Sequence, residues 1–263
     1  QLGMKENFLA NLMRCRGDFI AFCDGDDLWT DPKKLDRQVK FLLDHSEFSS
    51  VYHRMDLEAR DGTFIRELPP GRVAKPRAAC ADLLREGAFM PTSSIMIRNP
   101  GPTEWPSWLW CCENIVDFPI NLLNSTWGDI GYLDLNMGKY RTSSSDSAFT
   151  ARSGEEIYAE TFRMYSLLTK VFPPEMHSSF RRHQLKALWH IFLYRSRRSS
   201  NEQAIKSRDS AIRFAVNWGL KRLGFRFLSW ILVSFHAVYF ARLREWIAQR
   251  CVKSLGNPAS SLW

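Results

Sequence analysis

Several patterns that define common classes of protein are missing from this sequence. Its six cysteines form no CxxC pair and follow no secretory signal, which favours a reducing compartment and free thiols. Its six histidines have no HExxH spacing, and no glycine-rich phosphate-binding loop is present. These absences exclude a disulfide-stapled miniprotein, leave every histidine without an assigned metal, and disfavour a phosphoryl-transfer enzyme.

A long uncharged apolar run is also missing. Residues 227–241 carry no fixed charge, but this stretch is shorter than the ~20 apolar residues that cross a bilayer. Lysines and arginines flank it on both sides, so an interfacial helix is the better interpretation. Because 45% of the residues are hydrophobic and 24% are charged, the chain can nevertheless bury a core, which excludes a disordered tail and a collagen-like fibre.

Charge divides the 263 residues into two parts. Residues 152–263 hold 19 lysines and arginines against 7 aspartates and glutamates, whereas residues 1–151 hold 17 against 21. The acidic front part, at −4, suits a metal or polar-substrate site, and the basic back part, at +12, suits phosphates on a membrane surface or on nucleic acid. We therefore expect a catalytic domain at 1–151 and a basic, membrane-associating helical region at 152–263.

Helical and strand patterns alternate along the front part. Apolar residues at helical spacing predict a helix that ends before Gly17, and the apolar run at 19–23 predicts a buried parallel strand. Further helices are expected at about 30–44, 78–86 and 115–125, and further strands at 49–55, 63–68, 92–97, 130–135 and 137–140. Long helices are expected at 155–171, 175–196, 202–217 and 220–250. The alternation predicts an α/β fold with flanking helices, followed by an all-helical C-terminal region.

Three aspartates, Asp24, Asp26 and Asp27, follow the first predicted strand directly. This placement puts carboxylates at the C-terminal edge of a sheet, where open α/β folds bind their ligands. Crowded carboxylates repel one another unless a divalent cation or hydrogen-bond donors offset their charge, and hard oxygen ligands suit Mg²⁺ or Mn²⁺ that bridges substrate phosphates. A solvated turn rich in Asp and Gly is the competing interpretation. An EF-hand fits poorly, because Trp29 and Leu35 stand where its loop needs glycine and glutamate.

The sequence around this turn resembles the central segment of family 2 glycosyltransferases, which have the GT-A fold. The resemblance is carried by Asn7-Phe8, Gly17, residues 19–35 and Gln38-Val39. Downstream, residues 91–98 look like the acceptor-side strand of that family, and residues 117–141 look like the stretch that carries its catalytic base. The resemblance covers residues 5 to about 147. It implies a partial GT-A domain with a Rossmann-like mixed sheet, in an N-terminally truncated fragment that lacks the first nucleotide-binding βαβ segment.

The resemblance implies a metal-dependent inverting transferase of the hexosyltransferase type, which moves a sugar from a nucleotide-diphosphate sugar to an acceptor hydroxyl. Its cofactor is Mn²⁺ or Mg²⁺, bound by the DxD-type motif. By this resemblance Asp26 and Asp24 are the metal ligands, Asp24 also contacts ribose or a metal-bound water, and Asp27 orients the loop or the donor sugar. Asp117 matches the position of the catalytic base, with Glu113 four residues earlier as the alternate on the same helical face. Either acid also fits a helix N-terminus stabilised by the helix dipole.

Five further residues are candidates for contacts with the donor or acceptor: Asn7, Trp29, Ser93, Ser94 and Arg141. Trp29 either stacks on a sugar face or packs the turn against the following helix. Arg141 either meets diphosphate oxygens or forms a structural ion pair. The histidine that the family commonly carries two places after its Tyr-Arg pair is Ser143 here, which departs from the pattern on that side of the donor site. Asn7, Ser93 and Ser94 are placed near substrate by the resemblance alone.

The two parts together suggest where the protein works. The implied partners are a nucleotide-sugar donor, a sugar or lipid-linked acceptor, and an anionic membrane surface. No nucleic-acid partner is expected, because no recognised reader motif accompanies the basic charge. We expect a cytoplasmic protein, peripheral on the inner face of the cell membrane, that serves surface polysaccharide or glycolipid assembly. The alternative is a truncated, non-catalytic module that acts as a membrane-associated binding or scaffold protein.

Overall fold

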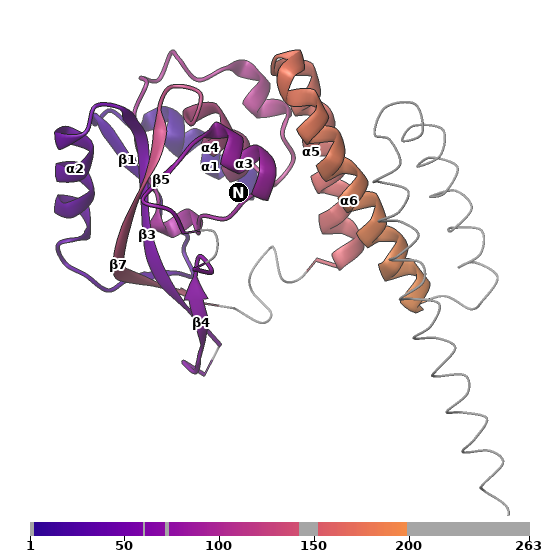
Figure 1. The fold of residues 1–263 in the computed structure, drawn as a ribbon, viewed down its shortest axis with the longest axis horizontal. Helices are drawn as coiled ribbons and strands as arrows, with labels where there is room; N and C mark the ends of the chain where they lie inside the picture. The colour runs from indigo at the N-terminus through magenta and orange to yellow at the C-terminus, as the bar shows by residue number, and fades with distance from the viewer. Residues whose placement is uncertain (1–2, 60, 72–73, 142–151, 199–263) are drawn as a thin grey trace, which may run out of the picture. The chain divides into compact units, whose positions relative to one another are not determined.

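The computed structural model describes residues 3–59, 61–71, 74–141 and 152–198 and has the α/β fold that the sequence predicts. A mixed sheet of seven strands lies between helices, and two long helices follow it in the chain (Figure 1). The helices predicted at 202–217 and 220–250 lie outside the described residues. In the described part of the chain, none of the helices combines the length and the apolar character needed to cross a membrane.

The strand order along the sheet is β1-β6-β3-β7-β2, with β4 beside β3 and β5 beside β7. The strands are β1 (Phe19–Ala21), β2 (Leu28–Trp29), β3 (Phe48–Glu58), β4 (Phe64–Leu68), β5 (Arg77–Ala78), β6 (Met96–Arg98) and β7 (Asp129–Arg141). β3 and β7 pair in parallel, and the other described pairs are antiparallel. Because β7 pairs with both β3 and β2, it joins the middle of the sheet to the strand that follows the acidic turn.

The sheet differs from the sequence prediction in the partner of β1. The apolar run at 19–23 predicts a buried parallel strand, but β1 pairs antiparallel with β6, and of its three residues only Ile20, opposite Ile97, is buried. The direction of pairing depends on the return path of the chain, which an apolar run does not encode. The strands predicted at 130–135 and 137–140 form one strand, β7, whose pairing with β3 shifts register along its length.

The segment before β6 also differs from its prediction. The alternation at 92–97 predicts a strand, but Thr92–Ser94 form a 3₁₀ turn, η1, and the strand begins only at Met96. The amide and the hydroxyl of Ser94 both donate to the carbonyl of Pro91. Such local bonding by serine competes with the ladder of a strand, which explains the turn.

The described helices are α1 (Met4–Arg14), α2 (Lys34–Asp44), α3 (Cys80–Glu86), α4 (Asp117–Asn124), α5 (Gly154–Val171) and α6 (Pro174–Arg198), with a second 3₁₀ turn, η2, at Ser107–Cys111. α2 begins later than predicted, because the amide of Thr30 donates to the carbonyl of Met137 and extends the pairing of β2 with β7. Similarly, Arg77 and Ala78 pair with β7 as β5, so α3 begins at Cys80. At both places, residues that the sequence pattern assigns to the start of a helix pair with β7 instead.

Helices cover both faces of the sheet (Figure 1). On one face Leu42 of α2 packs into a small core with Val51 of β3. On the other face α1, α3 and α4 cover a larger core, to which Leu83 of α3 and Phe118 of α4 contribute. Leu168 of α5 belongs to that same larger core. The sheet is therefore buried on both sides around the place where the acidic turn begins.

α5 and α6 belong to the same compact unit as the sheet. This unit runs from Gln1 to Arg198 and so extends past residue 151, where the charge pattern places the end of the front part. The reason lies in the buried face of α5, where Tyr165 packs edge-on against Phe118 of α4, with ring centroids 5.5 Å apart. The change of charge at residue 152 therefore marks no structural boundary. The helices predicted at 155–171 and 175–196 are confirmed as α5 and α6.

Candidate functional site

The acidic turn lies between β1 and β2 and is anchored to η1. After β1, the amide of Phe22 donates to the carbonyl of Ile95 (3.1 Å), and the amide of Asp24 donates to Ser93 Oγ (2.8 Å). The amide of Asp27 then donates to the carbonyl of Asp24 (3.1 Å), which closes the turn. Ser93 is fully buried, so its hydroxyl anchors the turn and is not open to a substrate in this structure.

Four carboxylates converge at this turn, those of Asp24, Asp26, Asp27 and Asp117. The pKa of Asp24 is raised to about 6, first by the loss of hydration and then by the charges of the other three. Burial also raises the pKa of Asp27 and of Asp117. The phenol of Tyr140, near the end of β7, is influenced by the same four charges, and burial together with these charges raises its pKa to about 12. The fold therefore brings Asp117 to the acidic turn from a distant part of the sequence.

Asp27 and Arg141 tie the turn to the end of β7. Asp27 is 8% exposed, and its Oδ1 accepts a hydrogen bond from the amide of Arg141 (3.2 Å). The guanidinium of Arg141 donates from Nε to the carbonyl of Asp26. The second carboxylate oxygen of Asp27, Oδ2, is buried and has no hydrogen-bond partner among the described residues. Arg141 thus holds the backbone of the turn, a role that neither of its sequence-based alternatives anticipates.

Asp117 is the first residue of α4, and its carboxylate lies in a tight recess. Thr92 Oγ1 donates to Asp117 Oδ2 over 3.2 Å, and the amide of Phe118 also bonds the carboxylate. The recess is lined by Phe8, Phe22, Thr92, Ile95, Ile120 and Asn121, and Asp117 itself is half-buried. The loss of hydration there outweighs these hydrogen bonds, so the pKa of Asp117 is raised. A carboxylate whose pKa lies closer to neutrality is well suited to accept a proton from a hydroxyl.

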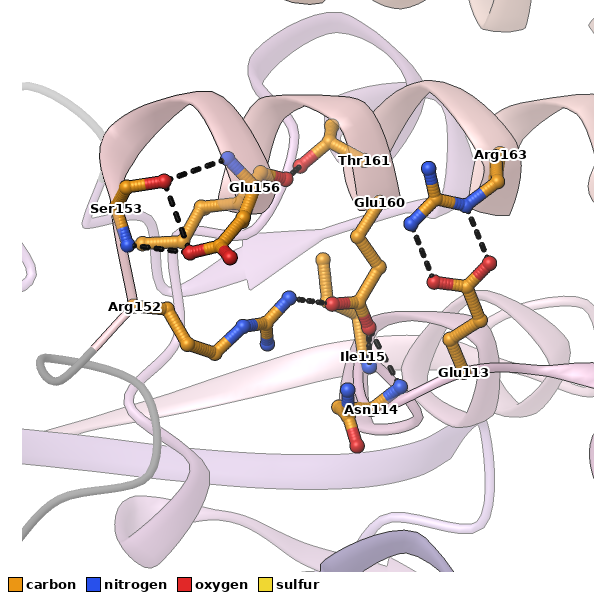
Figure 2. Close-up of polar contacts among 10 residues, drawn as sticks. Glu113, Asn114, Ile115, Arg152, Ser153, Glu156, Glu160, Thr161 and Arg163 are labelled. Carbon is orange, nitrogen blue, oxygen red and sulfur yellow. Dashed lines mark hydrogen bonds and ion pairs between the residues drawn. The ribbon is translucent and has the colours of Figure 1, made fainter.

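Glu113 is held by α5 and does not share a helical face with Asp117. α4 begins at Asp117, so Glu113 lies in the irregular segment before the helix, and the prediction of a common face is wrong. Both oxygens of its carboxylate accept hydrogen bonds from the guanidinium of Arg163, one of them over 2.7 Å (Figure 2). The hydrogen bonds and charge of Arg163 lower the pKa of Glu113. A carboxylate bound in this way is a weaker base than Asp117.

Trp29 packs between the turn and α2. Its Nε1 donates to the carbonyl of Ser93 (2.8 Å), and Nζ of Lys34 lies 4.0 Å from the centre of its ring. The ring is thus covered by a cation from α2 and fixed at its polar end by η1. Of the two alternatives for Trp29, the contacts in this structure are those of the packing role.

Asn7 and Ser94 differ in exposure. Asn7 is exposed on α1, and the next residue, Phe8, stacks on Phe22 with ring centroids 5.6 Å apart, which places this end of α1 beside the end of β1. Ser94 is fully buried, and its hydroxyl donates to the carbonyl of Pro91. Asn7 is accessible to a ligand, whereas Ser94 has a structural role.

Comparison with known proteins gives relatives without an assigned activity. No family model matches the chain. "Uncharacterized protein Mb1547" of Mycobacterium bovis and "Uncharacterized protein Rv1520" of Mycobacterium tuberculosis are each 32% identical to it over 156 residues. The match covers 57% of this chain and 43% of each relative, so it spans less than half the length of these curated proteins.

The carboxylates of the turn suit a divalent cation that binds together with its substrate. Within the described ranges, no three His, Cys, Asp or Glu side chains are arranged to hold a metal ion by themselves. Asp24 and Asp26 nonetheless offer hard oxygen donors, and Oδ2 of Asp27 is buried without a hydrogen-bond partner among the described residues. Mg²⁺ is commonly bound through one or two carboxylates, with water and substrate phosphates completing its shell, and carboxylates suit Mn²⁺ as well. The residues present therefore fit Mg²⁺ or Mn²⁺ held jointly by the turn and a phosphate-bearing ligand.

Sequence reasoning assigned no role to Lys34 and Gln38, which are both buried beside the turn. Lys34 is 1% exposed, its Nζ donates to Gln38 Oε1 (2.7 Å), and burial lowers its pKa to about 8. Gln38 Nε2 donates to the carbonyls of Val51 (3.2 Å) and Ser94 (2.8 Å), which fastens α2 to β3 and η1. A signal was available, because residues 34, 38 and 42 recur every four positions and form the buried face of α2.

Proposed function

We propose that this chain carries the metal site and the catalytic base of an inverting glycosyltransferase, which moves a sugar from a nucleotide-diphosphate sugar to an acceptor hydroxyl. The observation that supports the proposal is the convergence of Asp117 with Asp24, Asp26 and Asp27, where burial and then the charges of the other three carboxylates raise the pKa of Asp24 to about 6. Carboxylates crowded in this way are stabilised by a divalent cation. The matched region spans less than half of the mycobacterial relatives, which have no assigned activity, so the proposal rests on the residues of the turn.

In the proposed reaction, Asp117 removes the proton of the acceptor hydroxyl as the hydroxyl oxygen attacks the anomeric carbon of the donor. The new C–O bond forms on the face opposite the nucleoside diphosphate, and the bond to the diphosphate oxygen breaks with inversion. The proton stays on the carboxylate of Asp117, and the electron pair of the broken bond leaves with the diphosphate. General-base catalysis of this kind contributes roughly 10²- to 10⁴-fold in rate.

The turn supplies the other half of the proposed site. Asp26 and Asp24 hold Mn²⁺ or Mg²⁺, which when bound neutralises the charge that develops on the leaving diphosphate. Ser93 and Arg141 keep the turn in place through its backbone, since they bond the amide of Asp24 and the carbonyl of Asp26. Asn7 is exposed on α1 and is accessible to donor or acceptor.

The site is tested most directly by metal binding. We expect the protein to bind Mn²⁺ in isothermal titration calorimetry, and Asp26→Asn to abolish that binding without unfolding the protein. Asp36→Asn is the matched control, because Asp36 is an exposed aspartate on the neighbouring helix α2. Unchanged Mn²⁺ affinity in Asp26→Asn would remove the metal assignment.

The reaction is tested by turnover of a panel of nucleotide-diphosphate sugars, measured as release of the nucleoside diphosphate. We expect Mn²⁺-dependent release by the full-length protein that is lost in Asp117→Asn, with Mn²⁺ affinity retained. Mn²⁺ binding without release from any donor or with any acceptor would favour the non-catalytic scaffold instead.

We further propose a peripheral location on the inner face of the cell membrane, where a lipid-linked acceptor of surface polysaccharide or glycolipid assembly would be presented. The support is the net charge of +12 over residues 152–263. Sedimentation with vesicles tests this proposal: the protein should bind phosphatidylglycerol vesicles at low salt and not phosphatidylcholine vesicles. Equal binding to the two, or none to either, would contradict it.

A further inference from the structure

A buried carboxylate on α5 holds the segment that leads into α4. Glu160 is 1% exposed, and its Oε1 accepts hydrogen bonds from the amides of Asn114 (2.5 Å) and Ile115 (2.6 Å) (Figure 2). Its Oε2 accepts a hydrogen bond from Nη2 of Arg152. We propose that Glu160 is a positioning residue that sets the place of Asp117 through this segment, an inference that rests on the proposed role of Asp117 as the base.

The backbone of this segment depends on Glu160 for its hydrogen bonds. Residues 112–116 connect η2 to α4 without regular secondary structure. The amide of Cys112 still donates to the carbonyl of Leu109 at the end of η2, whereas the amides of Asn114 and Ile115 are bound by the carboxylate of α5. Both hydrogen bonds are part-buried and share one carboxylate oxygen, so one side chain fixes two consecutive peptide groups. The path of the chain into α4 is thus set from α5.

Asp117 lies between two points at which α5 holds the chain. On one side Glu160 binds the amide of Ile115, and on the other side the ring of Phe118 packs edge-on against Tyr165. Glu160 and Tyr165 both belong to the buried face of α5. A shift of this helix therefore displaces the backbone on both sides of the candidate base.

The charge of Glu160 is unusual for its position. The other residues on the buried face of α5 are Met164, Tyr165 and Leu168, so an apolar side chain would suit the packing. An apolar side chain, however, would leave the amides of Asn114 and Ile115 without their acceptor. A buried carboxylate also needs a counter-charge, which Arg152 supplies. Burying the carboxylate of Glu160 costs free energy, whereas its hydrogen bonds order two peptide groups of the segment. We take this combination to indicate that the position of the segment before α4 is important.

A second ion pair between the same two parts of the chain provides a matched control. Arg163, also on α5, binds Glu113 one residue before Asn114 (Figure 2). Both side chains are substantially exposed, 54% for Arg163 and 42% for Glu113, and the pair binds no backbone amide of the segment. Exposed pairs of this kind contribute little to stability. Arg163→Gln should therefore leave the segment in place.

The test compares Glu160→Ala, Glu160→Gln and Arg163→Gln in the full-length protein. In Glu160→Ala we expect faster amide hydrogen exchange at Asn114 and Ile115, and kcat lower by about 10- to 100-fold, since misplacement of a reacting group by about 1 Å can cost about 10²-fold. The donor KM and the Mn²⁺ affinity should change less than twofold, because the acidic turn is held by η1. Glu160→Gln keeps one oxygen acceptor for the two amides and should recover part of kcat, and Arg163→Gln should match the wild type.

Alkylation of Cys112 gives a readout that needs no activity. Cys112 is buried at the start of the segment, so iodoacetamide should label it slowly in the wild type and in Arg163→Gln, and faster in Glu160→Ala. If Glu160→Ala does not fold, Glu160→Gln carries the same comparison with smaller effects.

The outcomes separate this inference from the proposed function. Loss of turnover in Asp117→Asn together with unchanged kcat and unchanged exchange in both Glu160 variants would overturn the positioning role alone. Faster exchange in Glu160→Ala with unchanged kcat would also overturn it, because Glu160 would then be structural only. Full turnover in Asp117→Asn would overturn the proposed function, whatever the Glu160 variants do.

Discussion

The amide of Asp24 donates a hydrogen bond to Ser93 Oγ over 2.8 Å, and this bond joins the acidic turn to η1. The residues on either side of Ser93 reach other parts of the site. Thr92 donates to the carboxylate of Asp117, and the carbonyl of Ser94 accepts a hydrogen bond from α2. Three consecutive residues therefore hold the acidic turn, the candidate base and the helix that follows the turn.

Replacing Ser93 with alanine is expected to loosen the turn. The amide of Asp24 loses its acceptor at a buried position, which costs about 1–3 kcal/mol in the free energy of unfolding. Because the carboxylates are then less well placed, Mn²⁺ affinity should fall as well. Urea unfolding and calorimetry measure the two effects, with Ser46→Ala, an exposed serine, as the control. Equal stability and affinity in the two variants would show that Ser93 does not hold the turn.

Replacing Asp24 with asparagine is expected to stabilise the metal-free protein at neutral pH. The pKa of Asp24 is raised to about 6 in the folded state, so the folded state binds more protons than the unfolded state between about pH 4 and 6. The free energy of unfolding therefore falls as the pH rises through this range, by at most about 1.4 kcal/mol for each unit of pKa shift. Asparagine removes this loss, so the variant should gain stability relative to the wild type at pH 7 and not at pH 4.

Urea unfolding in EDTA at these two pH values measures the gain. Asp36→Asn is again the control, because Asp36 is an exposed aspartate on α2. A gain in Asp24→Asn that is the same at both pH values would mean that the ionisation of Asp24 is not its cause.

Replacing Lys34 with methionine should alter the response of stability to alkaline pH. Burial lowers the pKa of Lys34 to about 8 from its ordinary value of 10.5, so between these values the unfolded state holds a proton that the folded state has lost. The free energy of unfolding of the wild type should therefore rise relative to Lys34→Met as the pH increases from 7 to 10. Lys33→Met, at an exposed neighbour, is the control in the same denaturant titrations. Parallel pH curves for wild type and Lys34→Met would contradict the shifted pKa.

Replacing Gly128 with alanine should destabilise the sheet. A Cβ atom there would lie 2.8 Å from the carbonyl oxygen of Glu47 and 2.9 Å from the amide of Ser49. Both contacts are with backbone, so the start of β7 must move away from β3, and overpacking of this kind costs about 1–3 kcal/mol. Gly25→Ala in the acidic turn is the control, because its Cβ would meet nothing within 4 Å. Thermal unfolding compares the two, and equal midpoints would contradict the close approach at Gly128.

The longer elements of the fold could be predicted from periodicity, and the shortest could not. α5 has a mostly apolar buried face and β3 is buried along most of its length, so the apolar residues are enough to place them. β2 and β5 are two residues long and exist only through their pairing with β7. The antiparallel partner of β1 is likewise a property of the assembled sheet. Local sequence carries no signal for such pairing, and this is why it escapes prediction.

In the candidate site, too, the features that are local in the sequence could be predicted and the long-range ones could not. Asp24, Asp26 and Asp27 are adjacent in the sequence and could be predicted as a cluster, whereas the place of Asp117 was available only through a resemblance. Glu160 was not singled out, although an acid spaced four and eight residues from Met164 and Leu168 in an otherwise apolar stripe was a usable signal. Its partners are two backbone amides, so the identity of the side chains at residues 114 and 115 does not reveal the contact.

The contacts of η1 constrain the number of residues in this segment more tightly than the identity of those residues. One residue inserted between Pro91 and Ile95 would move three neighbouring contacts out of register together, because each belongs to a different element. The turn that joins β3 to β4 is exposed around Gly62 and makes no comparable set of contacts among the described residues, so extra residues there should be tolerated. Across related sequences we therefore expect insertions and deletions to accumulate at the β3–β4 hairpin and to be absent between Pro91 and Ile95.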